Sequence, residues 1–230
     1  MAYTTASSLI DAVRTELDNT AGSDTLLLQL VNSEHLRLQR EHDFSFQEQA
    51  ATRTLTTSAS GFARFAQPTD AKELITLYYI EASERKELNY LPFYDALAAY
   101  PDPSEANTPE AWSLFRNEVY IFPALNSAIA AELYYTRFLA DFTATASNDF
   151  LVWGSDALRY GTARAYAVWH GDQNRASYYQ ALLADAVTSL LKYHRASKLT
   201  PTQSTSMRTP GTVVGGGSRS RLRSLRDNRW

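Results

Sequence analysis

The four histidines are the scarcest reactive side chains of this sequence, so any catalytic or metal site is expected to involve them. They are His35, His42, His170 and His194. Glu34 and His35 do not form the paired-histidine zinc motif, because positions 38 and 39 are Leu and Gln. His35 lies between apolar residues of a helical stripe, which favours a half-buried packing role. His170 and His194 lie near predicted helix ends, where an imidazole interacts favourably with the helix dipole.

Other residue patterns also argue against catalysis. The stretch 154–156 lacks the flanking residues of a nucleophile elbow, and the sequence contains neither a P-loop nor a dinucleotide-binding glycine fingerprint. A mixed-charge stretch, typical of a solvated connector between strands, consists of Glu81, Glu84, Arg85, Lys86 and Glu87. The chain has no cysteine, which excludes disulfides and thiolate metal sites. The sequence therefore predicts a protein that is not an enzyme and needs no cofactor or metal.

Two amphipathic helices are predicted at the start of the chain. The first covers about 5–18, where Leu9, Val13 and Leu17 share one stripe behind Thr and Ser residues that can cap the first turn. The second covers about 24–43, with Asp24 as a possible cap. Its apolar face consists of Leu27, Leu30, Val31 and Leu38.

The middle of the chain predicts a small antiparallel β layer over about 51–138. The expected strands are 53–57 and 62–65, joined as a hairpin, then 74–80, 112–115, 118–122 and 130–137. Arg116-Asn117 is a two-residue hairpin signal between two of these strands. The proline-interrupted stretch 90–109 is interpreted as irregular, with at most a short helix at 93–99.

A long antiparallel helical hairpin is predicted over about 147–170 and 172–196. Small residues in the first helix, at positions 154, 157, 161 and 165, allow a neighbouring helix to approach closely. The second helix repeats Tyr179, Leu183, Ala186, Leu190 and Tyr193 at alternating spacings of four and three. The expected fold class is therefore α+β, mainly α: a helical bundle with this hairpin, a small antiparallel β insertion and an extended C-terminal arm.

The charge of residues 201–230 separates them from the rest of the chain. Their six arginines are Arg208, Arg219, Arg221, Arg223, Arg226 and Arg229, against one acid, Asp227. Subtracting this balance of +5 from the total of −3 leaves −8 on residues 1–200. The segment has too few apolar groups to offset the entropy of ordering, so we expect it to fold only on a partner. We therefore expect one domain at 1–200 and a basic arm at 201–230.

Three interpretations of this arm remain open. Leucines spaced among the arginines suggest anchors that dock into pockets of a protein. Ser-Arg dipeptides followed by Leu and Trp could instead track phosphates and stack a nucleic-acid base. The third interpretation is a solvated basic tail without a fixed partner. The N-terminus lacks a basic leader, and no run of eighteen apolar residues occurs, so we expect a soluble protein without export signal or membrane span.

The order of these elements, with several short motifs, resembles the head-to-tail adaptor proteins of tailed bacteriophages, also called head completion, connector or neck proteins. The motifs are Leu26–Asn32, Gln67–Asp70, Val119–Pro123, Glu132–Tyr135 with Leu139, and Asn148–Leu151 leading into Leu158–Gly161. The resemblance spans residues 5 to about 195. Each motif is weak alone, and their order and spacing carry the similarity. The proline-rich stretch and the long arm depart from the family pattern.

The resemblance implies a structural protein of the virion, made in the host cytoplasm. Such proteins assemble, commonly as twelve copies, into a ring under the portal that connects to a tail or nozzle component. The ring extends the DNA channel used in genome packaging and ejection, and genomic DNA passes through it without specific binding. The family's C-terminal arms order on the portal, and no catalytic residue is carried over. The expected portal-binding set is Arg219, Arg221, Leu222, Arg223, Leu225, Arg226 and Trp230.

Two other functions stay open at this point. A stopper, or another neck or tail completion protein, would share the ring role without contacting the portal. A nucleic-acid-binding protein would use the same basic arm on phosphates, and its binding would weaken steeply with salt.

Overall fold

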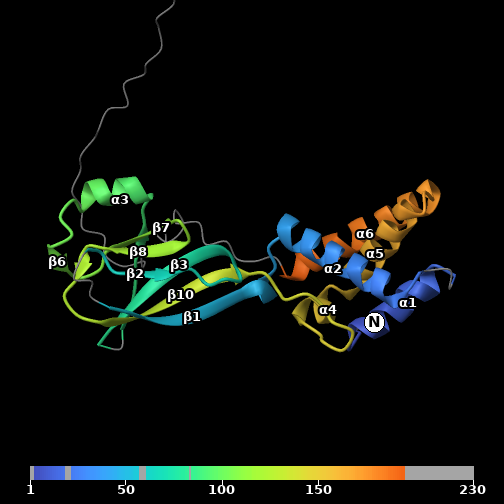
Figure 1. Ribbon diagram of the computed structural model, residues 1–230, viewed down its shortest axis with the longest axis horizontal. Helices are drawn as coiled ribbons and strands as arrows, with labels where there is room; N and C mark the ends of the chain where they lie inside the picture. Colours follow the sequence, from blue (N-terminus) through green and yellow to red (C-terminus); the bar gives the residue numbers. More distant parts are fainter. Residues whose placement is uncertain (1–2, 19–21, 57–60, 83, 195–230) are drawn as a thin grey trace, which may run out of the picture. The chain divides into compact units, whose positions relative to one another are not determined.

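The computed structural model describes residues 3–18, 22–56, 61–82 and 84–194. The helices are α1 (Ala6–Glu16), α2 (Asp24–Glu41), the short 3-10 helix η1 (Ser45–Gln47), α3 (Phe93–Ala99), α4 (Asp149–Trp153), α5 (Ser155–Trp169) and α6 (Gln173–His194). The strands are β1 (Glu48–Leu55), β2 (Arg64–Ala66), β3 (Ala71–Glu81), β4 (Glu84–Glu87), β5 (Asn89–Tyr90), β6 (Ala106–Asn107), β7 (Ala111–Phe115), β8 (Glu118–Phe122), β9 (Ala124–Leu125) and β10 (Ile129–Arg137). Figure 1 shows their arrangement.

Side-chain caps set the beginnings of the helices. Thr5 and Ser8 form a reciprocal capping box at α1. Ser23, rather than the expected Asp24, caps α2 by accepting a hydrogen bond from the Leu26 amide at 3.4 Å. Asn148 caps α4 in the same way, as the sequence predicts. Gly171, with φ of 76°, ends the first arm of the helical hairpin.

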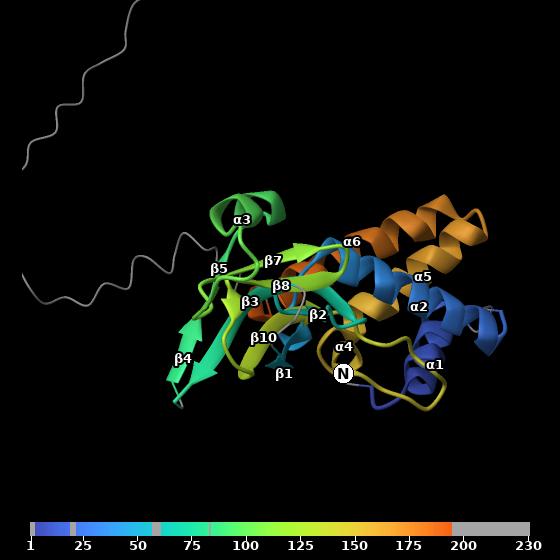
Figure 2. The ribbon, with the colours of Figure 1, turned by 60° about the vertical axis from the view of Figure 1, so that its left-hand side comes forward.

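The helices share one apolar core. It is formed by the buried faces of α1, α2, α4, α5 and α6, and it includes Leu9, Val31, Phe150, Leu158 and Leu183. The helices α5 and α6 lie side by side in Figures 1 and 2, as the predicted hairpin requires. The predicted helix 147–170, however, is interrupted at Gly154 and consists of two helices, α4 and α5. A Cβ atom at Gly154 would lie 2.5 Å from the Phe150 ring, so a larger residue there would force this ring to shift.

The strands, within the described ranges, form two four-stranded sheets and one two-stranded sheet. The first sheet has the order β1-β10-β3-β4 and is antiparallel throughout. The second has the order β2-β8-β7-β5, in which β5 runs parallel to β7, and β6 and β9 form a parallel pair. Leu77 and Leu133 of the first sheet pack with Val119 and Ile121 of the second. The helix α3 packs through Ala96 on Phe122 of the second sheet.

The expected fold class, a mainly helical bundle with a small antiparallel β insertion, is wrong. The structure is mixed α/β, with 44% of the described residues in helices and 29% in strands. Its β part has buried clusters of its own, and it contains parallel as well as antiparallel pairs. The stretch 90–109 was expected to be irregular with at most a short helix at 93–99; that helix is confirmed as α3, but the stretch also supplies part of β5 and all of β6. Prolines there lack one amide donor each, which interrupts ladders but does not prevent short edge strands.

The predicted hairpin of 53–57 with 62–65 is also wrong. The strand β1 pairs with β10, from Glu48 opposite Thr136 to Leu55 opposite Ile129, and β2 pairs with β8. Turn residues between two β-prone runs favour a local hairpin, but here burial against distant partners determines the pairing. The hairpin at Arg116-Asn117 is confirmed, because both residues have positive φ, 51° and 63°, as a two-residue turn between β7 and β8 requires.

Candidate protein-interaction surface

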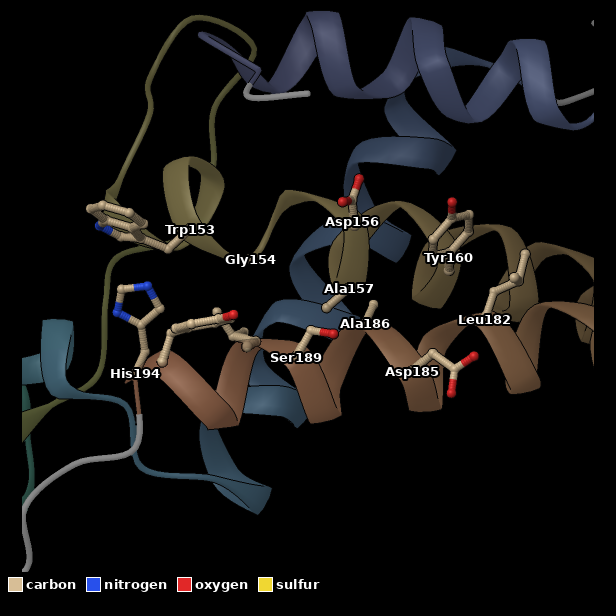
Figure 3. Close-up of a pocket in the computed structure, with 12 residues that line it drawn as sticks. Trp153, Gly154, Asp156, Ala157, Tyr160, Leu182, Asp185, Ala186, Ser189 and His194 are labelled. Carbon is tan, nitrogen blue, oxygen red and sulfur yellow. The ribbon is translucent and has the colours of Figure 1, made fainter.

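A groove lies between α5 and α6 and is lined by residues of both helices and of the end of α4. Its volume is about 740 Å³. Figure 3 shows Ala157 of α5 and Ala186 of α6 pointing toward each other between the two helices. Ala157 is buried, and the larger side chains Tyr160, Leu182 and Leu190 also line the groove.

Aromatic side chains form one end of this groove. Trp153 is 55% exposed and Tyr193 is 74% exposed. The ring of Trp153 lies 4.6 Å from that of His194, which also contacts Phe46 at 5.5 Å. These contacts hold the end of α6 against α4 and η1, and Figure 3 shows Trp153 beside His194. Exposed apolar groups of this size beside a groove are typical of a protein-contact surface.

Two carboxylates give the groove its charge. Asp156 comes from α5 and Asp185 from α6, and in Figure 3 they point in different directions along the groove walls. Neither has an ion pair with a residue that the structure describes, whereas Asp18, Asp43 and Asp149 are paired with cations. The groove thus presents two uncompensated negative charges next to aromatic rings. Guanidinium groups and apolar side chains of a protein neighbour match this combination.

The histidines lie in separate places and do not converge on a reaction centre. His35 is fully buried in α2, so the expected half-buried position is wrong. His170 follows α5, as predicted, and its Nε2 atom lies 2.7 Å from the Tyr166 hydroxyl. His194 lies in the last turn of α6 and packs on Trp153. Within the described ranges, no cluster of three or more His, Asp or Glu side chains is arranged to bind a metal ion.

The mixed-charge stretch is part of a strand pair rather than a loop. Glu84–Glu87 form β4, an edge strand whose residues are all exposed. Lys86 pairs with Glu81 at 2.7 Å, and Arg85 pairs with Glu132 of β10 at 3.0 Å. Charged residues on an edge strand prevent its pairing with other chains. The expected solvated connector is therefore corrected to a charged sheet edge.

The groove is not evident from the sequence patterns. Tyr193 continues the apolar repeat of the second helix, but it is exposed, because the buried part of the repeat ends at Leu190. The only available signal was the adjacency of Val152 and Trp153 to Gly154, where two bulky apolar residues precede a helix break. The predicted portal-binding residues, which lie in 219–230, are outside the described residues. They are Arg219, Arg221, Leu222, Arg223, Leu225, Arg226 and Trp230.

A mixed α/β subunit with an aromatic, acidic groove has the surface of a protein that binds other proteins. Comparison with known families identifies its class. Residues 4–211 match the SU10 adaptor protein family, and this match covers most of the chain. The chain therefore belongs to this family of phage head-to-tail adaptors, which are structural proteins of the virion. A search of curated proteins finds no match to the chain. Among the described helices, none is long and apolar enough to cross a membrane.

Proposed function

We propose that the chain forms a homo-oligomeric ring beneath the portal of a phage and connects the head to the tail. Twelve copies are expected, because that number is common among the adaptors that the sequence resembles. The ring extends the DNA channel and presents a platform to a tail or nozzle component. The observation that carries this proposal is the family match over residues 4–211.

Docking on the portal is assigned to the basic arm, residues 201–230. Its balance of +5 contrasts with −8 on residues 1–200, so the two parts favour partners of different charge. Arginine guanidinium groups of the arm would pair with acidic groups of the portal, while its leucines and Trp230 would fill pockets. A ring multiplies such contacts, so each arm can bind weakly while the whole assembly holds firmly.

Contact between neighbouring subunits is assigned to the groove on α5 and α6. Trp153 and Tyr193 expose large apolar surfaces, and assembly would remove these surfaces from water. Asp156 and Asp185 would then find cationic partners on the neighbouring copy. Arg40, Arg116 and Lys192 are exposed cations for which no ion pair is found in the described part of the chain. The subunit therefore carries both sides of a charge-complementary contact.

The net charge of residues 1–200 also suits a DNA conduit. A wall that is acidic on balance repels the phosphates of the genome, so that DNA slides without adhering. An assembled ring with a basic channel wall would contradict this part of the proposal.

The experiment that tests the proposal mixes the purified chain with the portal protein encoded by the same genome. Size-exclusion chromatography with light scattering gives the mass of the chain alone and of the complex. We expect a stoichiometric ring on the portal at physiological salt. A complex with the tail component but none with the portal would instead indicate a stopper.

Charge variants sharpen this experiment. The arm variant carries Arg219→Gln, Arg221→Gln, Arg223→Gln and Arg226→Gln. Its matched control carries Arg53→Gln, Arg64→Gln, Arg85→Gln and Lys86→Gln, four exposed cations of the sheets that lie outside the arm and the groove. Portal binding should be lost in the arm variant and retained in the control. Equal binding by both would overturn the assignment of portal docking to the arm.

Nucleic-acid binding is the second candidate function, and the six arginines of the arm favour it. A phosphate-binding arm would shift a DNA fragment at low salt and release it as salt rises, because each neutralised phosphate contributes to the salt dependence. An arm anchored in protein pockets depends less on salt. Binding to DNA, with no association with the portal, would favour nucleic-acid binding over portal docking as the function of the arm.

A further inference from the structure

A buried polar cluster joins α2 to the segment 138–148, which connects β10 with α4 and has no helix or strand of its own. Two amide side chains of α2 bind its backbone. Asn32 donates to the Phe142 carbonyl at 3.0 Å and accepts from the Phe142 amide at 2.8 Å. Gln39 accepts from the Leu139 amide at 2.6 Å. Because an irregular backbone in a buried setting must satisfy its polar groups, these side chains fix the segment in place.

Gln47 and Asn148 complete the cluster. Gln47, in η1, donates to Gln39 Oε1 and to the Arg137 carbonyl, each at 3.1 Å. Asn148 donates to the Ala140 carbonyl at 2.9 Å, and its Nδ2 atom lies 3.5 Å from His35 Nε2. The cluster therefore holds both ends of the connecting segment, next to β10 and next to α4.

His35 is the histidine within this cluster, and its protonation state follows from its partners. Gln39 Oε1 accepts the Leu139 amide, which can only donate, so the Gln39 NH₂ group must face His35 Nε2 at 3.0 Å. Nε2 must then accept, which places the proton of a neutral imidazole on Nδ1. Nδ1 has no hydrogen-bond partner in the structure. A second proton, on Nε2, would make this atom a hydrogen-bond donor that faces the NH₂ donor of Gln39.

Among the described residues, none places a carboxylate against His35 that would compensate an imidazolium. Its ring packs on Phe142 at 4.6 Å and on Phe150 at 5.1 Å. The neighbouring carboxylates are turned to other partners. Glu34 binds Arg37 and Arg164, Asp43 binds Lys72, and Asp149 binds Arg137. Burial accordingly lowers the pKa of His35 from 6.5 to about 4.

We propose that His35 is an acid-sensitive latch: the neutral imidazole orients Gln39 to hold residues 138–148 on α2, and its protonation releases this segment. The released segment is the connection from the first sheet to α4. Its release would loosen the junction between the sheets and the helices and withdraw Leu139 and Phe142 from the helical core, while α5 and α6 stay packed on each other. The groups that make the latch all lie within α2, η1 and residues 137–148.

The sign of the pH dependence follows from the direction of the shift. The open form binds a proton with an ordinary pKa near 6.5, and the closed form binds it only near pH 4. The latch is therefore fully stabilised above pH 6.5 and weakens as the pH falls from 6.5 toward 4. At pH 5 the opening equilibrium should rise by roughly 30-fold relative to pH 8.

Hydrogen exchange measured by mass spectrometry between pH 8 and 4.5, with rates corrected for intrinsic exchange, tests this proposal on the full-length chain. Protection of 138–148 should fall by at least roughly tenfold while α5 and α6 stay protected. His35→Leu should remove this pH dependence. Its matched control, His170→Gln, changes an exposed histidine and should behave as the wild type. A parallel loss of protection in α5 and α6 would overturn the proposal. The same pH-dependent loss of protection at 138–148 in His35→Leu would also overturn it.

Gln39→Glu provides a second test if His35→Leu does not fold. A carboxylate at this position accepts a hydrogen bond from a protonated Nε2 and stabilises the imidazolium, so the His35 pKa should rise by at least one unit. An NMR titration of the His35 ring follows that shift directly. An unchanged pKa would show that Gln39 does not face the imidazole, and the latch would be rejected.

Discussion

The helices α5 and α6 present two faces that differ in chemistry. The inward face is apolar and packed, with Leu158, Ala163 and Leu183 all buried in the helical core. The outward face carries Asp185 and Tyr193 beside an open groove, and Trp153 of α4 lies at one end of this groove. One helical hairpin therefore holds the fold on one side and offers a contact surface on the other. Stability and assembly should respond to different substitutions.

The largest expected effect is on stability, from Phe150→Ala on the inward side. Phe150 is fully buried and its ring packs against His35, Phe44 and Phe46. Its truncation should lower the free energy of unfolding by about 3–5 kcal/mol. Urea denaturation followed by circular dichroism measures the loss. Val152→Ala, at an exposed neighbouring position, should change stability by less than about 0.5 kcal/mol.

A smaller loss of stability is expected from Gly154→Ala at the break between α4 and α5. The added methyl group would lie 2.5 Å from the buried Phe150 ring, which must shift to admit it. We expect a cost of about 1–3 kcal/mol, measured in the same way. Ser189→Ala, on the opposite wall of the groove, is the control and should be neutral. A stabilised Gly154→Ala protein would show that helix continuity outweighs packing at this position.

The outward face should show the reverse behaviour. Trp153→Ser combined with Tyr193→Ser should lower stability by only about 1 kcal/mol, because both side chains are more than half exposed. Ring formation on the portal should nevertheless be lost, as judged by electron microscopy of the complex. Trp169→Ser with Tyr178→Ser changes two equally exposed aromatic residues at the other end of the hairpin and serves as the control. Loss of the ring only in this control would move the subunit contact to that end.

The sequence predicted the helices far better than the sheets, and the reason is physical. Helical stripes, caps such as Asn148 and the terminating Gly171 act between residues that are close in sequence. The pairing of β1 with β10 joins residues some eighty positions apart and depends on which apolar faces bury each other. The turn at Arg116-Asn117 was predictable because its signal is local. The amount of β structure was underestimated because two-residue strands such as β5 and β6 have no pattern of their own.

The candidate surfaces were predictable to different degrees. The arginine arm is evident from charge alone, and its role stays a prediction, because residues 195–230 are outside the described residues. The groove was missed, since exposure of Tyr193 depends on where α6 leaves its neighbours. The burial of His35 was underestimated, because Phe142 and Phe150 cover it from a distant part of the chain. Long-range packing is the information that the sequence patterns lack.

We propose above all that this adaptor docks on the portal through its basic arm. A chain lacking residues 218–230 should remain folded and helical by circular dichroism, because the described helices end at His194. Size-exclusion chromatography with light scattering then compares it with the full-length chain in the presence of the portal. We expect a ring complex for the full-length chain and separate elution for the truncated one. Retention of the ring complex after truncation would contradict this proposal.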